Sequence, residues 1–219
     1  MHAIYNIVSG PLVWVAFIIF IGGSIYRLVS MALLAKKKDP MVYAYMNPKF
    51  ALRSIFHWII PFASVNSRKN PILTIVTFLF HIGLIFVPVF LFAHIILFKE
   101  SWNISWWFLS DGAADFMTLI VIAGCIFFAV RRITQPEVRF LTSPSDFVIL
   151  SIIAAPFVTG FWTYHQWVGH EWTAILHMLS GEIMLAVIPF TRLSHMLFFP
   201  FTRGYMGSEF GAVRHVKDW

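Results

Sequence analysis

Five long apolar segments, separated by short polar or charged stretches, dominate the hydrophobic pattern of the chain. A helix needs about 20 mostly apolar residues to cross a bilayer. The predicted helices cover residues 11–35, 71–98, 113–131, 147–168 and 172–195. The pattern therefore predicts an all-α integral membrane bundle of five transmembrane helices, with residues 1–219 forming a single membrane-embedded domain.

A sixth, shorter helix is expected in the loop after the first apolar segment. Asn47 and Pro48 form a helix start signal, a capping residue followed by proline at the first helical position. In the run that follows, apolar Phe50, Ala51, Ile55, Trp58 and Ile59 alternate with Lys49, Arg53 and Ser54. This alternation predicts a short amphipathic helix that lies on the inner membrane surface.

The amino-acid composition is also that of an integral membrane protein. Hydrophobic residues make up 59% and charged residues 12% of the chain, and the mean hydropathy is +0.77. A soluble core of this chain length does not hide so much apolar surface. The net charge of +6 sits at the ends of apolar segments instead of forming a basic face, so membrane lipid, and not nucleic acid, is the expected partner.

The basic residues also predict the orientation. If the N-terminus is outside, the loops and tails on the outer side contain Lys99 as their only basic residue out of the 16 Lys and Arg. Arg27 lies near an inner end and can extend to that side. The positive-inside rule therefore predicts the N-terminus outside and the C-terminus inside.

Four of the nine histidines fall on two of the predicted helices. The second helix carries His81 near its inner third and His94 near its outer end, and the antiparallel fifth helix carries His177 near its outer end and His195 just past its inner end. Ionisable side chains in membrane helices are costly and usually functional. Imidazoles at matched depth on facing helices are what bis-histidine haem ligation requires. The pattern predicts an inner haem on His81 and His195 and an outer haem on His94 and His177.

Helix geometry fits this arrangement with two bends. The rise from His81 to His94 is roughly 20 Å and that from His177 to His195 roughly 27 Å, and Pro189 offers a bend that absorbs the difference. Thirteen residues turn the second helix by about 140°, so Pro88 is expected to re-aim its outer turn.

The haems are expected to be of b type, that is, held without covalent bonds. The single cysteine, Cys125, lies in an apolar run, whereas covalent c-type haem needs paired cysteines and iron–sulfur clusters need several. Gly83 and Gly181, close to the histidines, suit either a porphyrin edge or plain helix packing. His165, His170 and the intramembrane Glu182 are candidate proton or quinone contacts. No residue constellation suggests covalent catalysis.

The strings FHIGLIFVPVFLFAH and HMLSGEIMLAVIPFTRLSH, in the setting of five helices, resemble the gamma (cytochrome b) subunit family of respiratory nitrate reductase. The wide histidine spacing on the second helix is most similar to the related membrane cytochromes of the Hmc, Tmc and Dsr redox complexes of sulfate-reducing bacteria. The resemblance covers nearly the whole chain and implies the same four haem ligands: His81, His195, His94 and His177.

The resemblance also implies a setting for the protein. It implies a multi-pass subunit of a respiratory complex in the bacterial inner membrane, with iron–sulfur proteins as partners inside and multihaem cytochromes c outside. Electrons would pass between the quinone pool, with menaquinone as the candidate, and these partners.

Three alternatives remain open. Cytochromes b of hydrogenase or formate dehydrogenase distribute their haem ligands differently over four helices. A histidine-rich membrane metal enzyme would use His165, His170 and His177 as a cluster. A proton-coupled transporter would use Glu182 and Asp115, but it would need a polar cavity or inverted repeats, and no repeat is visible.

Overall fold

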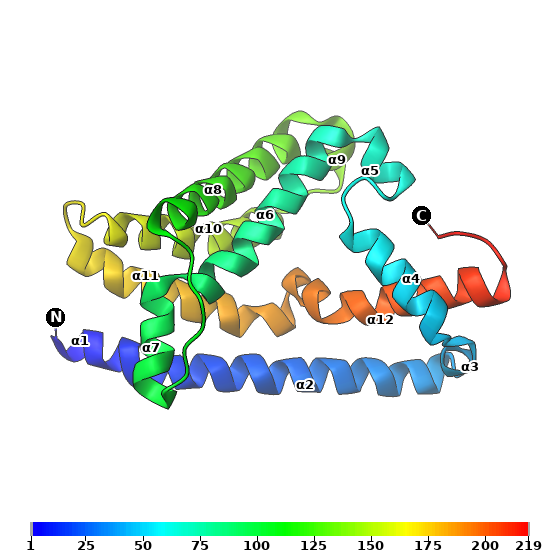
Figure 1. The fold of residues 1–219 in the computed structure, drawn as a ribbon, viewed down its shortest axis with the longest axis horizontal. Helices are drawn as coiled ribbons and strands as arrows, with labels where there is room; N and C mark the ends of the chain where they lie inside the picture. The colour runs from blue at the N-terminus through cyan, green and yellow to red at the C-terminus, as the bar shows by residue number, and fades with distance from the viewer. Residues whose placement is uncertain (1, 219) are drawn as a thin grey trace. The chain divides into compact units, whose positions relative to one another are not determined.

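A computed structural model of the chain describes residues 2–218. These residues form helices and connecting turns, without β-strands (Figure 1). The α-helices are α1 His2–Ile7, α2 Val13–Lys38, α3 Met41–Tyr45, α4 Pro48–Ile59, α5 Val65–Lys69, α6 Pro71–Phe90, α7 Phe92–Trp102, α8 Asp111–Thr134, α9 Pro136–Phe140, α10 Pro144–Tyr164, α11 His170–Val187 and α12 His195–Ser208. Tighter or wider helical turns are η1 Val8–Leu12, η2 Ile188–Phe190, η3 Arg192–Ser194 and η4 Glu209–Val213. The prediction of an all-α chain is confirmed.

Five helical stretches are long and apolar enough to cross a membrane, as predicted. They are His2–Lys38, Pro71–Phe90, Asp111–Thr134, Pro144–Tyr164 and His170–Phe190. The chain divides into two compact units: unit 1 comprises Met1–Val8 and Ile75–Gly181, and unit 2 comprises Ser9–Thr74 and Glu182–Trp219.

The second predicted helix, residues 71–98, is broken in the structure. Helix α6 ends at Phe90, Leu91 is extended with ψ of 129°, and α7 starts at Phe92. Figure 1 shows α7 leaving α6 in a new direction. Pro88 lies in the last turn of α6, and the helix ends two residues after it, at Phe90. The segment that carries His94 is therefore a separate helix, and not the kinked continuation of α6 that the sequence predicted.

The fifth predicted helix, residues 172–195, is also interrupted. Helix α11 ends at Val187, and Pro189 lies in the tight turn η2. Thr191 is extended, with φ of −121° and ψ of −174°. His195 is the first residue of α12. The continuous helix assumed for the rise between His177 and His195 is thus wrong, because Pro189 and the extended Thr191 separate the two residues.

Unit 1 is built on close contacts of α8 with α6 and α10. A β-carbon added at Gly83 of α6 would lie 2.7 Å from Val121 Cγ2, and one added at Gly124 of α8 would lie 2.8 Å from Phe80 Cδ2. Val121 is fully buried. Gly83 therefore serves the packing of α6 on α8, one of the two roles open to it from the sequence. Helices α8 and α10 lie side by side in the same unit (Figure 1).

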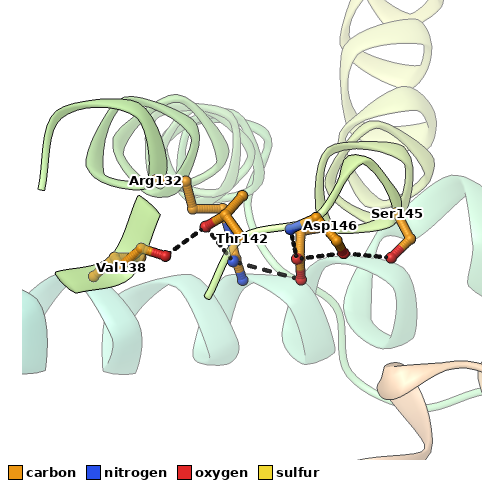
Figure 2. Close-up of polar contacts among 6 residues, drawn as sticks. Arg132, Val138, Thr142, Ser145 and Asp146 are labelled. Atoms are coloured by element: carbon orange, nitrogen blue, oxygen red, sulfur yellow. Dashed lines mark hydrogen bonds and ion pairs between the residues drawn. The ribbon is translucent and has the colours of Figure 1, made fainter. Parts of the chain in front are cut away.

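The turn from α8 to α10 is held by the capping segment Ser143-Pro144-Ser145-Asp146 at the start of α10. Asp146 accepts hydrogen bonds from the Ser143 backbone N–H (2.8 Å) and hydroxyl (3.0 Å). Its other oxygen lies 3.4 Å from Arg132 Nη1 of α8 (Figure 2). Arg132 also lies 3.4 Å from the Thr142 hydroxyl, which donates to the Val138 carbonyl. Because the Asp146 side chain is only 3% exposed, this carboxylate needs the partners that it has.

Unit 2 contains a pair of helices, α4 and α12, packed through small residues. A β-carbon added at Gly207 of α12 would overlap Ser54 Cβ and lie 2.6 Å from the Phe50 carbonyl oxygen of α4. The Ser208 hydroxyl accepts from the Asn47 backbone N–H at 3.0 Å. In the same unit, a β-carbon on Gly23 of α2 would lie 3.0 Å from Pro189 of η2.

The amphipathic helix is present, but its buried face differs from the predicted one. Asn47 caps α4 as expected, with its side chain accepting from the Lys49 N–H at 3.1 Å. Ser54, assigned to the polar face, is fully buried. The reason is the approach of Gly207, which leaves room beside α4 only for small side chains.

Gly207→Ala is expected to destabilise the α4–α12 pair by about 1–3 kcal/mol, because the new methyl group overlaps backbone as well as side-chain atoms. Gly204→Ala is the matched control on the same helix, since its β-carbon would meet nothing closer than Ala51 Cβ at 3.5 Å. The measurement is the thermal unfolding midpoint of the purified protein in detergent. Equal midpoints for the two variants would contradict this account of the packing.

Candidate functional site

Unit 1 brings together His94 of α7 and His177 of α11, the predicted outer pair. Their ring centroids are 5.9 Å apart and their planes differ by 15°. Both side chains are half-buried. The two residues are 83 positions apart in the chain, so the fold, and not local sequence, creates this arrangement.

Each of these two imidazoles is held by a backbone carbonyl. His94 Nδ1 lies 2.9 Å from the Pro88 carbonyl oxygen, and His177 Nδ1 lies 2.8 Å from the Pro156 carbonyl oxygen. A carbonyl can only accept, so Nδ1 carries the proton and the lone pair of the neutral ring is on Nε2. Histidines that bind metals are characteristically oriented by such a bond from the other nitrogen.

The carbonyl that holds His94 is a product of the helix break. Pro88 lies in the last turn of α6, where carbonyl groups have no partner further along the helix. The chain then turns at Leu91 and returns the His94 side chain to that carbonyl, six residues earlier in the sequence. The proline expected only to bend the helix therefore also supplies an acceptor for the imidazole.

Gly160 of α10 gives His177 its position. A β-carbon added at Gly160 would lie 2.8 Å from His177 Cε1 and 2.9 Å from Nδ1. Gly160 lies four residues after Pro156, on the same face of α10, so one helix provides both the space and the hydrogen-bond acceptor. A β-carbon at Gly181, expected from the sequence to lie beside His177, would meet nothing within 4 Å.

Both rings are of the kind that a haem iron takes as ligands. Each is an imidazole whose Nε2 is not used by the bond to the carbonyl, and the two ring centroids lie 5.9 Å apart. Two neutral imidazoles are the axial ligand set expected for a b-type haem, so the residue types present fit this group.

The predicted inner pair falls on two different units. His81, in unit 1, donates from Nδ1 to the Thr77 carbonyl at 2.7 Å and lies edge-on to Phe80, with ring centroids 5.4 Å apart. His195, in unit 2, donates from Nδ1 to the Arg192 carbonyl at 2.9 Å and is exposed. Both rings thus have the same tautomer as the outer pair. Their pairing stays a prediction.

The remaining candidate residues take other positions. His165 caps the end of α10, with Nε2 3.2 Å from an Asp115 carboxylate oxygen on α8. Exposed His170 begins α11. Within residues 2–218, no group of three or more His, Cys, Asp or Glu side chains is arranged to hold a metal ion. His165, which the metal-enzyme alternative groups with His170 and His177, instead contacts Asp115.

Glu182, the predicted intramembrane carboxylate, lies in α11 and is 8% exposed. Neither of its carboxylate oxygens has a hydrogen-bond partner among the described residues. Glu182 thus makes no structural hydrogen bond to a neighbouring helix within the described residues.

Sequence reasoning missed two parts of the outer site, Gly160 and the Pro156 carbonyl, and elsewhere it missed the pairing of His165 with Asp115. The four-residue spacing of Pro156 and Gly160 was visible. It carries little information alone, since small residues recur throughout apolar helices. Only the tertiary contact between α10 and His177 distinguishes these two residues from the rest.

Comparison with known proteins identifies a relative of similar length. No protein-family model and no solved structure matches the chain. A curated protein of Nitratidesulfovibrio vulgaris (strain Hildenborough), described only by the word "Protein", is 35% identical over 214 residues, which cover 96% of this chain and 95% of the relative. Identity at this level over nearly the full length of both chains indicates common ancestry. The chain therefore belongs to the same family as this Nitratidesulfovibrio vulgaris protein.

Proposed function

We propose that this chain is a di-haem b-type cytochrome subunit of a membrane-bound respiratory redox complex. The observation that carries the proposal is the His94–His177 pair, two nearly parallel imidazoles 5.9 Å apart in a chain with five candidate membrane spans. Both rings present Nε2 as the ligand atom, since backbone carbonyls accept from both Nδ1 atoms. A pair used only for packing does not require this tautomer in both rings.

The chain's own residues would bind, orient and insulate the cofactors. His94 and His177 would hold the outer haem, and His81 and His195 the inner haem. A haem held by two histidines supplies reversible one-electron transfer. The carbonyls of Pro88 and Pro156 keep the outer imidazoles from rotating, and their hydrogen bonds increase the basicity of Nε2 toward iron. The apolar helices limit the access of water, which tunes the reduction potential.

The setting of the subunit is part of the same proposal. The N-terminus lies outside and the C-terminus inside, in a bacterial cytoplasmic membrane, as the basic residues favour. Electrons cross between the quinone pool, with menaquinone as the candidate, and partner redox subunits, an iron–sulfur protein inside and a multihaem cytochrome c outside. The resemblance of the two histidine segments to the nitrate reductase gamma-like cytochromes supports these partners. Quinol oxidation or quinone reduction would accompany the electron transfer.

The first test is the haem content of the purified protein, produced with haem available. A reduced-minus-oxidised absorption spectrum is expected to show b-type bands, and pyridine haemochrome analysis is expected to give about two haems per chain, one for each histidine pair. One haem per chain would remove one of the two sites from the proposal. No haem in folded protein would overturn it.

Single-ligand replacements separate the two sites. His177→Ala and His195→Ala are each expected to leave roughly half the haem per chain, because each removes one axial ligand of a different haem. His170→Ala, which changes an exposed histidine at the start of α11, is the matched control and should retain both. Two intact haems in His195→Ala would refute the inner pairing, and two in His177→Ala would refute the outer one.

Gly160→Ala tests the outer site without removing a ligand. The added methyl group would lie 2.8 Å from His177 Cε1, so the imidazole must move away from the Pro156 carbonyl, and loss of the outer haem, roughly half the total, is expected. Gly181→Ala is the control, since its methyl group would meet nothing within 4 Å. The same haem content in both variants would mean that Gly160 does not position the ligand.

A further inference from the structure

The carboxyl group of Glu182 is an ionisable group that the proposed haem sites do not use. It lies within the candidate membrane span His170–Phe190 and is the only ionisable side chain between His177 and Arg192. The residues that follow it, up to Phe190, are all apolar. At 8% exposure, Glu182 is more than nine-tenths buried.

No hydrogen bond in the described part of the chain compensates an ionised Glu182. Both carboxylate oxygens are buried without a hydrogen-bond partner. Helix α2, which packs on η2 through Gly23 and Pro189 within unit 2, has Arg27 as its only charged side chain before Lys36. The Arg27 guanidinium lies over the Phe198 ring, 5.4 Å from its centroid. Glu182 thus has no counter-ion on α2.

The two protonation states of such a group differ greatly in cost. An isolated carboxylate in an apolar environment loses its hydration and gains nothing in return, whereas the neutral acid loses much less. Membrane helices rarely carry an acidic residue unless it has a function. A buried carboxyl group used only for packing would also be expected to have a hydrogen-bond partner.

We propose that Glu182 is an intramembrane proton-binding site, a carboxyl group that holds a proton at neutral pH within the apolar span. This role does not depend on the haem ligands and would apply to a haem-free chain as well. It adds a second chemistry to the chain, the binding of a proton by a carboxyl group within the candidate span His170–Phe190.

An apolar carbodiimide is the probe for such a group. The protonated carboxyl adds to the reagent: a carboxyl oxygen bonds to the carbodiimide carbon, and the carboxyl proton passes to a carbodiimide nitrogen. Migration of the acyl group to nitrogen then gives a stable N-acylurea. No other reactant is consumed, so the mass of the peptide rises by that of the whole reagent. An ionised carboxylate in water at about pH 8 lacks the required proton, since the usual pKa of glutamate is about 4.3.

The experiment treats the purified full-length chain with N,N′-dicyclohexylcarbodiimide at about pH 8 and locates the label by peptide mass spectrometry. Labelling of Glu182 is expected to exceed that of Glu171, an exposed residue of the same helix, by about tenfold or more. Labelling is expected to persist in Glu171→Gln and to disappear in Glu182→Gln. A water-soluble cationic carbodiimide should label Glu182 far less.

Labelling of Glu182 no greater than that of Glu171 in the unaltered protein would overturn the proposal. This comparison needs no variant, so a folding defect in Glu182→Gln does not affect it. Equal labelling of Glu182 by the apolar and the water-soluble reagents would also overturn it, because it would place the carboxyl in water. Haem content, measured on the same samples, tests the proposed cytochrome function separately.

Discussion

An imidazole in an apolar helix needs a hydrogen-bond partner, and the backbone of a regular helix has few to spare. The outer histidine pair meets this constraint through two prolines. The carbonyl of Pro88 is available because α6 stops beside it, and the carbonyl of Pro156 is reached because Gly160 leaves room for the His177 ring. Both bonds direct the proton to Nδ1 and the lone pair to Nε2. The proposed ligation at His94 and His177 depends on these two contacts.

Close approach of helices through glycine is the second recurring feature. Gly83 and Gly124 bring α6 and α8 together in unit 1, and Gly207 brings α12 onto α4 in unit 2. In lipid, helices gain little from hydrophobic association, so tight packing and hydrogen bonds supply much of the attraction between them. The Ser208 hydroxyl, bonded to the Asn47 backbone, combines both effects at one contact.

Polar groups in the apolar parts of the chain fall into two kinds. Asp146 is buried but has Ser143 and Arg132 as partners, and it serves the turn between α8 and α10. Glu182 is buried without partners among the described residues. Asp146 therefore has the environment of a structural carboxylate. The environment of Glu182 is unfavourable for an ionised carboxylate, as expected for a carboxyl group with a functional role such as proton binding. Burial alone does not separate them; the presence of partners does.

The sequence was enough to predict the all-α class, five apolar segments, the capping of α4 and the four histidines of interest, because hydropathy and capping are local properties of the chain. It did not determine where the second and fifth helices stop. Proline predicts a disturbance there, but whether it bends or ends the helix depends on the surrounding packing. The burial of Ser54 in α4, and the contacts of the His177 ring with Gly160 and the Pro156 carbonyl, required the tertiary structure. These features arise from contacts between segments far apart in the sequence, which no local pattern encodes.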